Sequence, residues 1–364
     1  MPYLVVLARF VVPIALPLGV KVTLAAVLFV GSQYHLWCRL SSGSVFSPEF
    51  PRWLVILLTW SVGTILFLAL LVLGLDVVTV LTMVMKQAYV TVPDSVQYVL
   101  AATAALLAGI GVVAAIRVPP LKDISVPIRD LPLQFDGYRL LQLSDLHISR
   151  LFPAAWARTV VDRANALGVD LMVVTGDFID GTLAARRADV EPLRHLRAPD
   201  GVYAVSGNHE SIFGAREWTR HLATLGLHFL ANDHVFLERG AGRLALAGVT
   251  DLSGVELDGG RDLEAALAGI PADLPVVLLD HQPRMARDAA AHGVALQLSG
   301  HTHGGMIRGL DRLVARGNAG YVSGRYDVDG MTLYVNNGTA LWPGFALRLG
   351  RPPELTRITL RQMT

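Results

Sequence analysis

The sequence predicts an N-terminal region of transmembrane helices, about four spans in residues 1–117, followed by an α/β (α+β) domain in residues 138–364. Hydrophobic residues make up 52% of the 364 residues, and the mean hydropathy of +0.46 is high for a soluble protein. Residues 1–117 hold only six basic and three acidic residues, which leaves 25 of the 31 basic and 27 of the 30 acidic residues for the remainder. After residue 138, short apolar runs alternate with amphipathic helical patterns. The break in composition therefore separates a membrane region from a soluble domain.

The membrane region contains several apolar runs in series. Residues 53–75 are uncharged and exceed the roughly 20 residues that a helix needs to cross a bilayer. Residues 96–116 are rich in small side chains, which let helices approach closely, and residues 20–37 end in aromatic anchors. Residues 1–19 and 77–92 fit either a span or an interfacial helix. A core helix or a signal peptide explains one such run, but not a series that lacks a small-residue cleavage site.

An even number of spans places both chain ends on one side of the membrane. Basic residues flank the start and the exit of the region: Arg9, Lys21, Arg117, Lys122 and Arg129. This distribution favours the cytoplasmic side for both ends, although the loop that carries Arg39 and Arg52 opposes it. Cys38 is the only cysteine, so an intramolecular disulfide is excluded.

A proline-marked linker is predicted at residues 118–137, and the soluble domain then reads as strands separated by helices. The predicted strands are residues 139–143, 171–175, 202–205, 244–249, 276–279, 294–298 and 333–336. The clearest predicted helices are residues 154–167, 215–225 and 262–268. The pattern predicts one main core and shows no internal repeat.

Polar side chains follow five of these strands directly. They are Asp145 and His147, Asp177 and Asp180, Asn208 and His209, Asp280 and His281, and His301 and His303. Sites in open sheets form at the carboxyl ends of strands, and residues at i and i+2 of an extended chain point the same way. Any one of these groups alone fits a cap or a turn about equally well. Five groups of compatible chemistry together predict a shared site.

The ligand types indicate the metal. Aspartate, histidine and asparagine without cysteine suit Mn, Fe or Zn, and Mn is the expected ion. Seven residues are the candidate ligands: Asp145, His147, Asp177, Asn208, His281, His301 and His303. One ion takes about four to six ligands, so we expect two divalent metal ions. Two ions about 3.5–4 Å apart are the arrangement that clamps the attacking and leaving oxygens in phosphoryl chemistry.

These motifs, taken in order, resemble the calcineurin-like metallophosphoesterase superfamily. The pattern D-x-H, G-D-x-x-D, G-N-H-[DE], a lone His and G-H-x-H corresponds to residues 145–147, 176–180, 207–210, 281 and 300–303. The resemblance covers residues 138–360, and the closing run 334–360 is similar to the tail of bacterial, often membrane-attached, branches. It implies an αββα sandwich with the metals at one edge, and a place in the bacterial inner (plasma) membrane.

The resemblance also implies roles for single residues. One metal would be held by Asp145, His147, Asp177 and His303, and the other by Asp177, Asn208, His281 and His301. Asp177 would bridge the two ions, and Asn208 would also meet the substrate. His209 would protonate the leaving oxygen, Asp180 would orient His209, and a hydroxide bridging the metals would be the nucleophile.

Two further positions, Asp280 and Arg348, are open from the sequence. Asp280 either tunes the neighbouring His281 or faces solvent. Arg348 either contacts a substrate phosphate, as arginine forks do, or is an ordinary surface residue. Gly304 and Gly305 are expected to let the backbone pass close to the metals without a Cβ atom.

The function predicted from these features is that of a membrane-anchored, dinuclear metal-dependent phosphoesterase, a hydrolase of phosphodiester or pyrophosphate bonds. Its substrate would be a small-molecule or lipid-linked phosphate. Membrane attachment favours a phospholipid phosphodiester or a nucleotide-activated glycolipid pyrophosphate, but soluble phosphodiesters or cyclic nucleotides remain open. The nearly neutral soluble domain gives no support for a nucleic-acid partner, and the sequence identifies no protein partner. The alternative is a non-catalytic membrane scaffold that retains the fold, which the complete set of motif residues disfavours.

Overall fold

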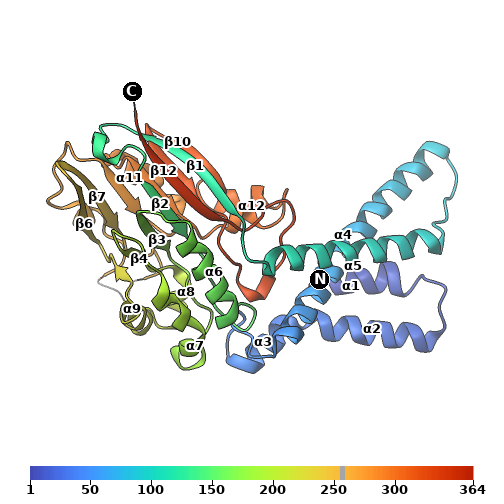
Figure 1. The fold of residues 1–364 in the computed structure, drawn as a ribbon. Helices are drawn as coiled ribbons and strands as arrows, with labels where there is room; N and C mark the ends of the chain where they lie inside the picture. Colours follow the sequence, from blue (N-terminus) through green and yellow to red (C-terminus); the bar gives the residue numbers. More distant parts are fainter. Residues whose placement is uncertain (255–258, 364) are drawn as a thin grey trace. The chain divides into compact units, whose positions relative to one another are not determined.

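The computed structural model describes residues 1–254 and 259–363, which divide into two compact units (Figure 1). The helical unit comprises Met1–Ala115 together with Pro343–Arg348. The sandwich unit comprises Ile116–Trp342 together with Leu349–Thr364.

The helical unit contains the membrane region. Its helices are α1 (Pro2–Val6), η1 (Leu7–Val11), α2 (Leu18–Ser32), α3 (Tyr34–Ser42), α4 (Arg52–Lys86) and α5 (Asp94–Ile116). Among the described residues, α4 and α5 are the two helices long and apolar enough to cross a membrane. The segment 77–92 mostly continues α4, and residues 20–37 are divided between α2 and α3. Two spans thus meet the length criterion, and the other two of the expected four stay a prediction.

A short segment from near the C-terminus belongs to the helical unit. The carbonyl of Pro343 accepts a hydrogen bond from the Tyr34 hydroxyl at 3.0 Å, and the backbone N–H of Arg348 donates to the Gly111 carbonyl at 3.0 Å. A Cβ atom at Gly63 would lie 2.9 Å from the Leu347 side chain, so this glycine makes room for a buried leucine. The single domain expected over residues 138–364 is therefore interrupted, because an apolar turn packs with α4 and α5.

The described part of the sandwich unit has two six-stranded sheets (Figure 1). The first, in spatial order, consists of β1 (Leu121–Ile128), β12 (Leu355–Gln362), β2 (Arg139–Leu143), β3 (Leu171–Thr175), β4 (Val202–Val205) and β5 (His228–Phe229). The second consists of β10 (Gly324–Val328), β11 (Met331–Val335), β9 (Leu296–Ser299), β8 (Val276–Leu279), β7 (Gly242–Gly248) and β6 (Asp233–Arg239). Strands β2 to β5 are parallel to one another, as are β7, β8, β9 and β11.

Helices accompany both sheets. They are α6 (Ala154–Ala166), α7 (Leu183–Val190), α8 (Asn208–Phe213), α9 (Ala215–Ala223), α10 (Leu263–Leu267), α11 (Ala286–Ala291) and α12 (Asp311–Gly317). Helices α6 to α9 follow strands of the first sheet, while α10 and α11 share a buried apolar cluster with β7, β8 and β11 of the second (Figure 1). The αββα sandwich is confirmed.

The main core lies between the sheets. Leu140, Val173 and Val205 of the first sheet share one buried cluster with Val277 and Leu298 of the second. Because successive strand residues point to opposite faces, the intervening residues of these strands face the helices. They are buried as well, which explains why these strands are apolar on both faces.

All seven strands predicted from apolar runs are present, with shifts of two residues or fewer at most ends. The expected linker, residues 118–137, is partly wrong, because it contains β1. This strand holds Pro127, which normally argues against a strand, but β1 lies at the edge of its sheet and pairs only with β12. An edge position tolerates the missing N–H donor.

Candidate metal centre

The loops after five parallel strands bring all the predicted site residues of the sandwich unit to one edge. Asp145 and His147 follow β2, Asp177 and Asp180 follow β3, Asn208 and His209 follow β4, His281 follows β8, and His301 and His303 follow β9. Hydrogen bonds then lock the first two loops together. The N–H groups of Asp145 and His147 donate to the carbonyls of Gly176 and Asp177, both at 3.0 Å. Backbone hydrogen bonds thus continue from the strands into the two loops that carry the predicted ligands.

The backbone is strained at these positions. Five predicted ligands have a positive φ angle, between 42° and 69°, in a region that non-glycine residues rarely adopt: Asp145, His147, Asp177, His301 and His303. Each such conformation costs on the order of 1–3 kcal/mol and persists where the surroundings impose it, typically at functional sites.

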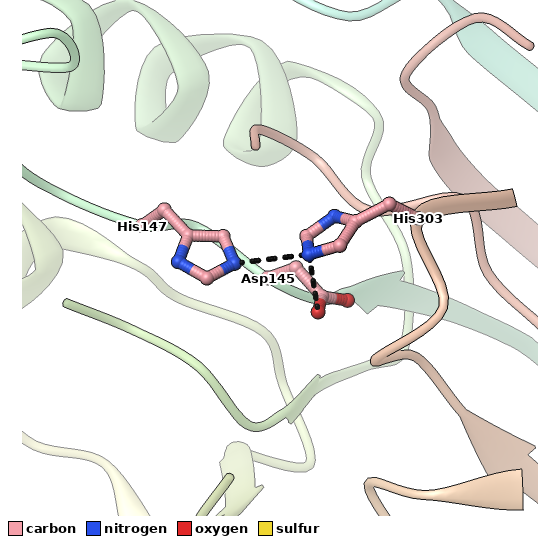
Figure 2. Close-up of side chains that lie close together, drawn as sticks. All are labelled: Asp145, His147 and His303. Atoms are coloured by element: carbon pink, nitrogen blue, oxygen red, sulfur yellow. Dashed lines mark hydrogen bonds and ion pairs between the residues drawn. The ribbon is translucent and has the colours of Figure 1, made fainter. Parts of the chain in front are cut away.

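Asp145, His147 and His303 form the first group of donors (Figure 2). Nε2 of His147 lies 3.2 Å from Nε2 of His303, which in turn lies 3.7 Å from Oδ1 of Asp145. Asp145 is fully buried, and its carboxylate accepts hydrogen bonds from the Ser144 hydroxyl at 2.6 Å and from the His301 N–H at 3.0 Å. Its orientation is therefore fixed before any ion binds.

Asp177, Asn208, His281 and His301 form the second group. Oδ1 of Asn208 lies 3.1 Å from Nε2 of His281 and 2.8 Å from Nδ1 of His301. Nε2 of His281 also lies 3.3 Å from Oδ2 of Asp177. The same oxygen of Asp177 is 3.8 Å from Nε2 of His147 in the first group. Asp177 thus lies between the two groups, as a bridging carboxylate must.

The donor chemistry fits two cations. The Nδ1 atom of His281 is 2.7 Å from the Thr175 carbonyl, so the neutral ring keeps its proton on Nδ1 and has its lone pair on Nε2 for a metal. The Nδ1 atom of His147 is held in the same way, 3.0 Å from Oδ2 of Asp180. Among the residues that the structure describes, no lysine or arginine pairs with the buried carboxylates of Asp145 and Asp177. Buried charges require a partner, and divalent metal ions would supply it here.

The pKa values show the same deficit of positive charge in the metal-free protein. Burial lowers the pKa of His281, but the carboxylate of Asp177 outweighs it and holds that pKa well above its ordinary value. Conversely, burial raises the pKa of Asp177, but the neighbouring His281 and His209 hold it well below the usual range. Without metal, protons on His281 and His209 therefore offset part of the charge of the carboxylates.

His209 is buried beside the two groups and is oriented by Asp180. Its Nδ1 atom lies 2.5 Å from Oδ1 of Asp180, and its Nε2 atom lies 4.0 Å from Oδ2 of Asp177. Burial lowers the pKa of His209, but Asp177 and Asp180 outweigh it and raise the pKa to about 9. His209 therefore holds a proton on the nitrogen that faces the cluster.

Glu210 is a buried positioning residue that the motif analysis did not single out. One of its oxygens accepts from the N–H groups of Gly207 at 2.7 Å and Asp177 at 3.0 Å, and the other accepts from Phe178 at 2.8 Å. It thus ties the loop after β4 to the loop after β3. A sequence signal existed, because Glu210 stands three residues after Gly207 at the start of α8, where a glutamate bonds back to the helix entrance.

Glycines other than the two expected ones clear space for the ligands, among them Gly300 and Gly207. A Cβ atom at Gly300 would lie within 2.3 Å of Oδ2 of Asp145, and one at Gly207 within 2.2 Å of Oδ1 of Asp177. Added Cβ atoms at Gly304 and Gly305 would instead meet the neighbouring Asn337 and Asp311. The prediction that Gly304 and Gly305 spare the metals is therefore wrong in detail, although both have positive φ angles.

The structure also shows the surroundings of Asp280 and Arg348, the two positions left open by the sequence. Asp280 is fully buried rather than exposed, and it pairs with Nε of Arg261 at 3.0 Å. Burial raises the pKa of Asp280 to about 6, although Arg261 opposes the shift. Arg348 is buried in the Pro343–Arg348 segment of the helical unit, so it is not an exposed surface residue. Its contact with a substrate phosphate stays a prediction.

Comparisons with known proteins agree with this site. The family model for calcineurin-like phosphoesterases matches residues 138–305. Two relatives, each named transmembrane protein with metallophosphoesterase domain, come from Danio rerio and Bos taurus and are 34% identical over 71% and 70% of this chain. These matches span only 61% and 60% of the relatives' own length.

A shorter relative is matched over most of its length. The uncharacterized metallophosphoesterase YkuE of Bacillus subtilis is 33% identical over 239 residues, which is 64% of this chain and 82% of that protein. The motifs, the sandwich, the clustered donors and these matches lead to one conclusion: the chain belongs to the calcineurin-like phosphoesterase family.

Proposed function

We propose that this chain is a membrane-anchored, metal-dependent phosphoesterase that hydrolyses a phosphodiester or pyrophosphate bond, with a lipid-linked phosphate as substrate. The observation that carries the proposal is the pair of donor groups at the carboxyl edge of the two sheets, with Asp177 between them. Oδ2 of Asp177 lies 3.3 Å from Nε2 of His281 in one group and 3.8 Å from Nε2 of His147 in the other. Two divalent ions held there would polarise the phosphoryl oxygens and lower the pKa of water, which is the chemistry that hydrolysis requires.

Each predicted ligand has its part in this proposal. Asp145, His147, Asp177 and His303 hold one ion, and Asp177, Asn208, His281 and His301 hold the other. Mn is the proposed ion, because the donor set is oxygen and imidazole without thiolate. With its Oδ1 on the second ion, Asn208 would have its amide NH2 left to donate to a phosphoryl oxygen.

His209 supplies the proton in the proposed reaction. Its Nδ1 atom is held by Asp180, so the proton that it gives away is on Nε2, the nitrogen that faces the donor groups. The leaving oxygen takes this proton as its bond to phosphorus breaks, which avoids the release of a strongly basic alkoxide. Cations at Asp177 would lower the pKa of His209 from about 9 towards neutrality, where a general acid is most effective.

The helical unit supports the lipid-linked substrate class. Helices α4 and α5 have the length and composition of membrane spans, and the two relatives from Danio rerio and Bos taurus are named transmembrane proteins. We place the protein in a bacterial inner membrane with the phosphoesterase domain on the cytoplasmic side, because basic residues flank the membrane region at Arg9 and Arg117. Reporter fusions at the C-terminus, active only on one side of the membrane, test this orientation.

Hydrolysis by the full-length protein in detergent tests the proposed activity. With added Mn, the protein is expected to cleave bis(p-nitrophenyl) phosphate and at least one of a panel of lipid-linked phosphates. The Asp177→Asn variant is expected to be inactive, because it weakens both donor groups at once. No hydrolysis of any substrate with Mn, Fe or Zn would instead favour a non-catalytic membrane scaffold.

A further inference from the structure

Arg284 is an arginine that the proposed reaction has not yet used, three residues beyond His281. It lies in the short helix η4 (Pro283–Met285), which directly follows the loop that carries this histidine from β8. The residue is exposed, whereas His281 and Gln282 are buried. Arg284 thus stands at the surface, close along the chain to the second donor group.

A chain of hydrogen bonds holds the Arg284 side chain in place. Its Nε atom donates to Oε1 of Gln282 at 3.2 Å. The amide nitrogen of Gln282 donates to both carboxylate oxygens of Asp251, at 3.1 and 3.0 Å. Asp251 is fully buried and also accepts from the N–H of Ser253 at 2.8 Å. The arginine is therefore anchored through its Nε atom to residues that are themselves fixed.

The rest of the guanidinium group is not engaged. In the described ranges, 1–254 and 259–363, no carboxylate pairs with Arg284, and its only hydrogen bond uses Nε. Arg261 shows the contrast, because it is buried and pairs with both Asp280 and Asp288. The terminal nitrogens of Arg284 thus remain available to bind an anion in the fork geometry that suits phosphate.

Arg284 lies at the same edge of the sheet as the candidate metal centre. His281 is the second residue after β8, and Arg284 stands three residues further on, in η4. A chain advances at most about 3.6 Å per residue, so the Cα atoms of Arg284 and His281 are at most about 11 Å apart.

We propose that Arg284 binds a second phosphoryl group of the substrate, next to the one that is cleaved, and so directs the enzyme to pyrophosphate bonds. The inference rests on the proposed function and narrows its substrate class. The scissile phosphoryl group would lie against the two donor groups, and a simple phosphodiester offers no further anion for an anchored guanidinium. In the reaction, water attacks one phosphorus and releases a proton to solvent, and the P–O bond to the bridging oxygen breaks. The departing phosphate takes a proton from His209, which regains one from solvent.

Selectivity between substrates tests the proposal in the full-length, metal-loaded protein. The substrates are bis(p-nitrophenyl) phosphate, UDP-glucose as a soluble pyrophosphate, and a UDP-linked acylated sugar in detergent micelles. Arg284→Met is compared with Arg287→Met as a matched control. Arg287 is also exposed, lies on the following helix α11 and forms no side-chain ion pair or hydrogen bond with the residues that the structure describes. Loss of a charge-assisted pair predicts that Arg284→Met lowers kcat/KM for pyrophosphate relative to phosphodiester by about tenfold or more.

The outcomes separate this inference from the proposed function. A tenfold shift in the ratio for either pyrophosphate supports the inference, and the substrate that shows it identifies a soluble or a lipid-linked source. If the ratio of kcat/KM for pyrophosphate to that for phosphodiester is unchanged, or equals that of Arg287→Met, the inference is overturned. Hydrolysis of the diester in the same experiment still supports the proposed function. If no substrate is hydrolysed, calorimetric binding of methylenediphosphonate and methylphosphonate decides. Weaker binding of the diphosphonate alone in Arg284→Met supports the inference, and equal binding overturns it.

Discussion

The carboxylate of Asp180 lies 2.5 Å from Nδ1 of His209, the candidate proton donor. Its other oxygen lies 3.0 Å from Nδ1 of His147, a predicted metal ligand. Asp180 is fully buried, and His147 and His209 together hold its pKa below the ordinary value even though burial opposes this shift. One carboxylate therefore orients both a ligand and the acid, which couples metal binding to proton transfer.

Asp180→Asn is expected to weaken both functions together. An amide cannot accept a hydrogen bond from both rings through two oxygens, so one histidine loses its orientation. Loss of such a supporting group typically lowers metal affinity or activity by about 10- to 100-fold. Metal titration and kcat are measured beside Asp162→Asn, an exposed aspartate of α6. Wild-type values for both quantities in Asp180→Asn would contradict the assigned role.

His209→Ala is expected to separate catalysis from metal binding. Removal of a general acid typically lowers the rate by about 10²- to 10⁴-fold, whereas the two donor groups keep all their predicted ligands. The measurements are kcat for bis(p-nitrophenyl) phosphate and bound metal per chain, with the exposed His195→Ala as control. If His209→Ala loses its metal, His209 is a ligand and not the acid.

Metal binding is expected to release protons, and metal affinity is expected to fall as the pH falls. The pKa of His281 lies well above its ordinary value in the metal-free protein, so its ring is protonated at pH 7 and must lose a proton to become a ligand. Protons therefore compete with the metal more strongly at lower pH. Calorimetric titrations in two buffers of different ionisation enthalpy measure the protons released. A heat of binding that is the same in both buffers would rule out this exchange.

The positions of the strand ends could be predicted from the sequence, because the signal lies in a few consecutive residues. A buried strand is an apolar run of four or five residues, and the residue pairs Asp145 with His147 and His301 with His303 follow such runs directly. Parallel strands place their carboxyl ends at one edge, so recognition of the strands was enough to bring the ligands together. The seven predicted ligands, His209 and Asp180 therefore meet as expected.

The features that were missed depend on distant partners. Strand β1 is stabilised by β12, more than 200 residues later in the chain, and Pro127 hides its pattern. Arg261 and Asp280 form an ion pair although they are 19 residues apart, and no local motif predicts it. From the sequence, the turn that contains Leu347 is assigned to the soluble domain. Leu347 is in fact buried against glycines of α4 and α5, and the local sequence does not indicate this contact. Long-range packing stabilises all three features, and such packing is difficult to predict from a single sequence.

Gly300→Ala is expected to impair the first donor group. The added methyl group would overlap the Ser144 hydroxyl and Oδ2 of Asp145, so the carboxylate must move. We expect metal affinity to fall by about tenfold or more, as for other disruptions of ligand orientation. Gly317→Ala is the matched control, because nothing lies within 4 Å of its added Cβ atom. Equal metal titrations for the two variants would contradict the claim that Gly300 clears space for Asp145.

Arg261→Met is expected to destabilise the protein in a pH-dependent way. It leaves the buried carboxylate of Asp280 without a partner, which typically costs about 3–5 kcal/mol. The pKa of Asp280, about 6, is raised above its unfolded value, so the folded state gains a proton as the pH falls. The loss in Tm should therefore be large at pH 8 and smaller at pH 5.

Thermal unfolding in detergent at the two pH values measures this difference. Arg194→Met serves as the control, because Arg194 and Glu191 form an exposed pair whose loss should leave Tm unchanged. A loss in Tm for Arg261→Met that is equal at both pH values would show that the charge of Asp280 is not its cause.

The number of metal ions bound by each chain tests the central claim most directly. Full-length protein is loaded with Mn, freed of excess ion and analysed by elemental mass spectrometry, beside the Asp177→Asn variant. The two donor groups, with the carboxylate of Asp177 between them, predict two ions per chain in the wild-type protein and fewer than two in Asp177→Asn. No bound Mn, Fe or Zn in the wild-type protein, or an undiminished two ions in Asp177→Asn, would contradict the account.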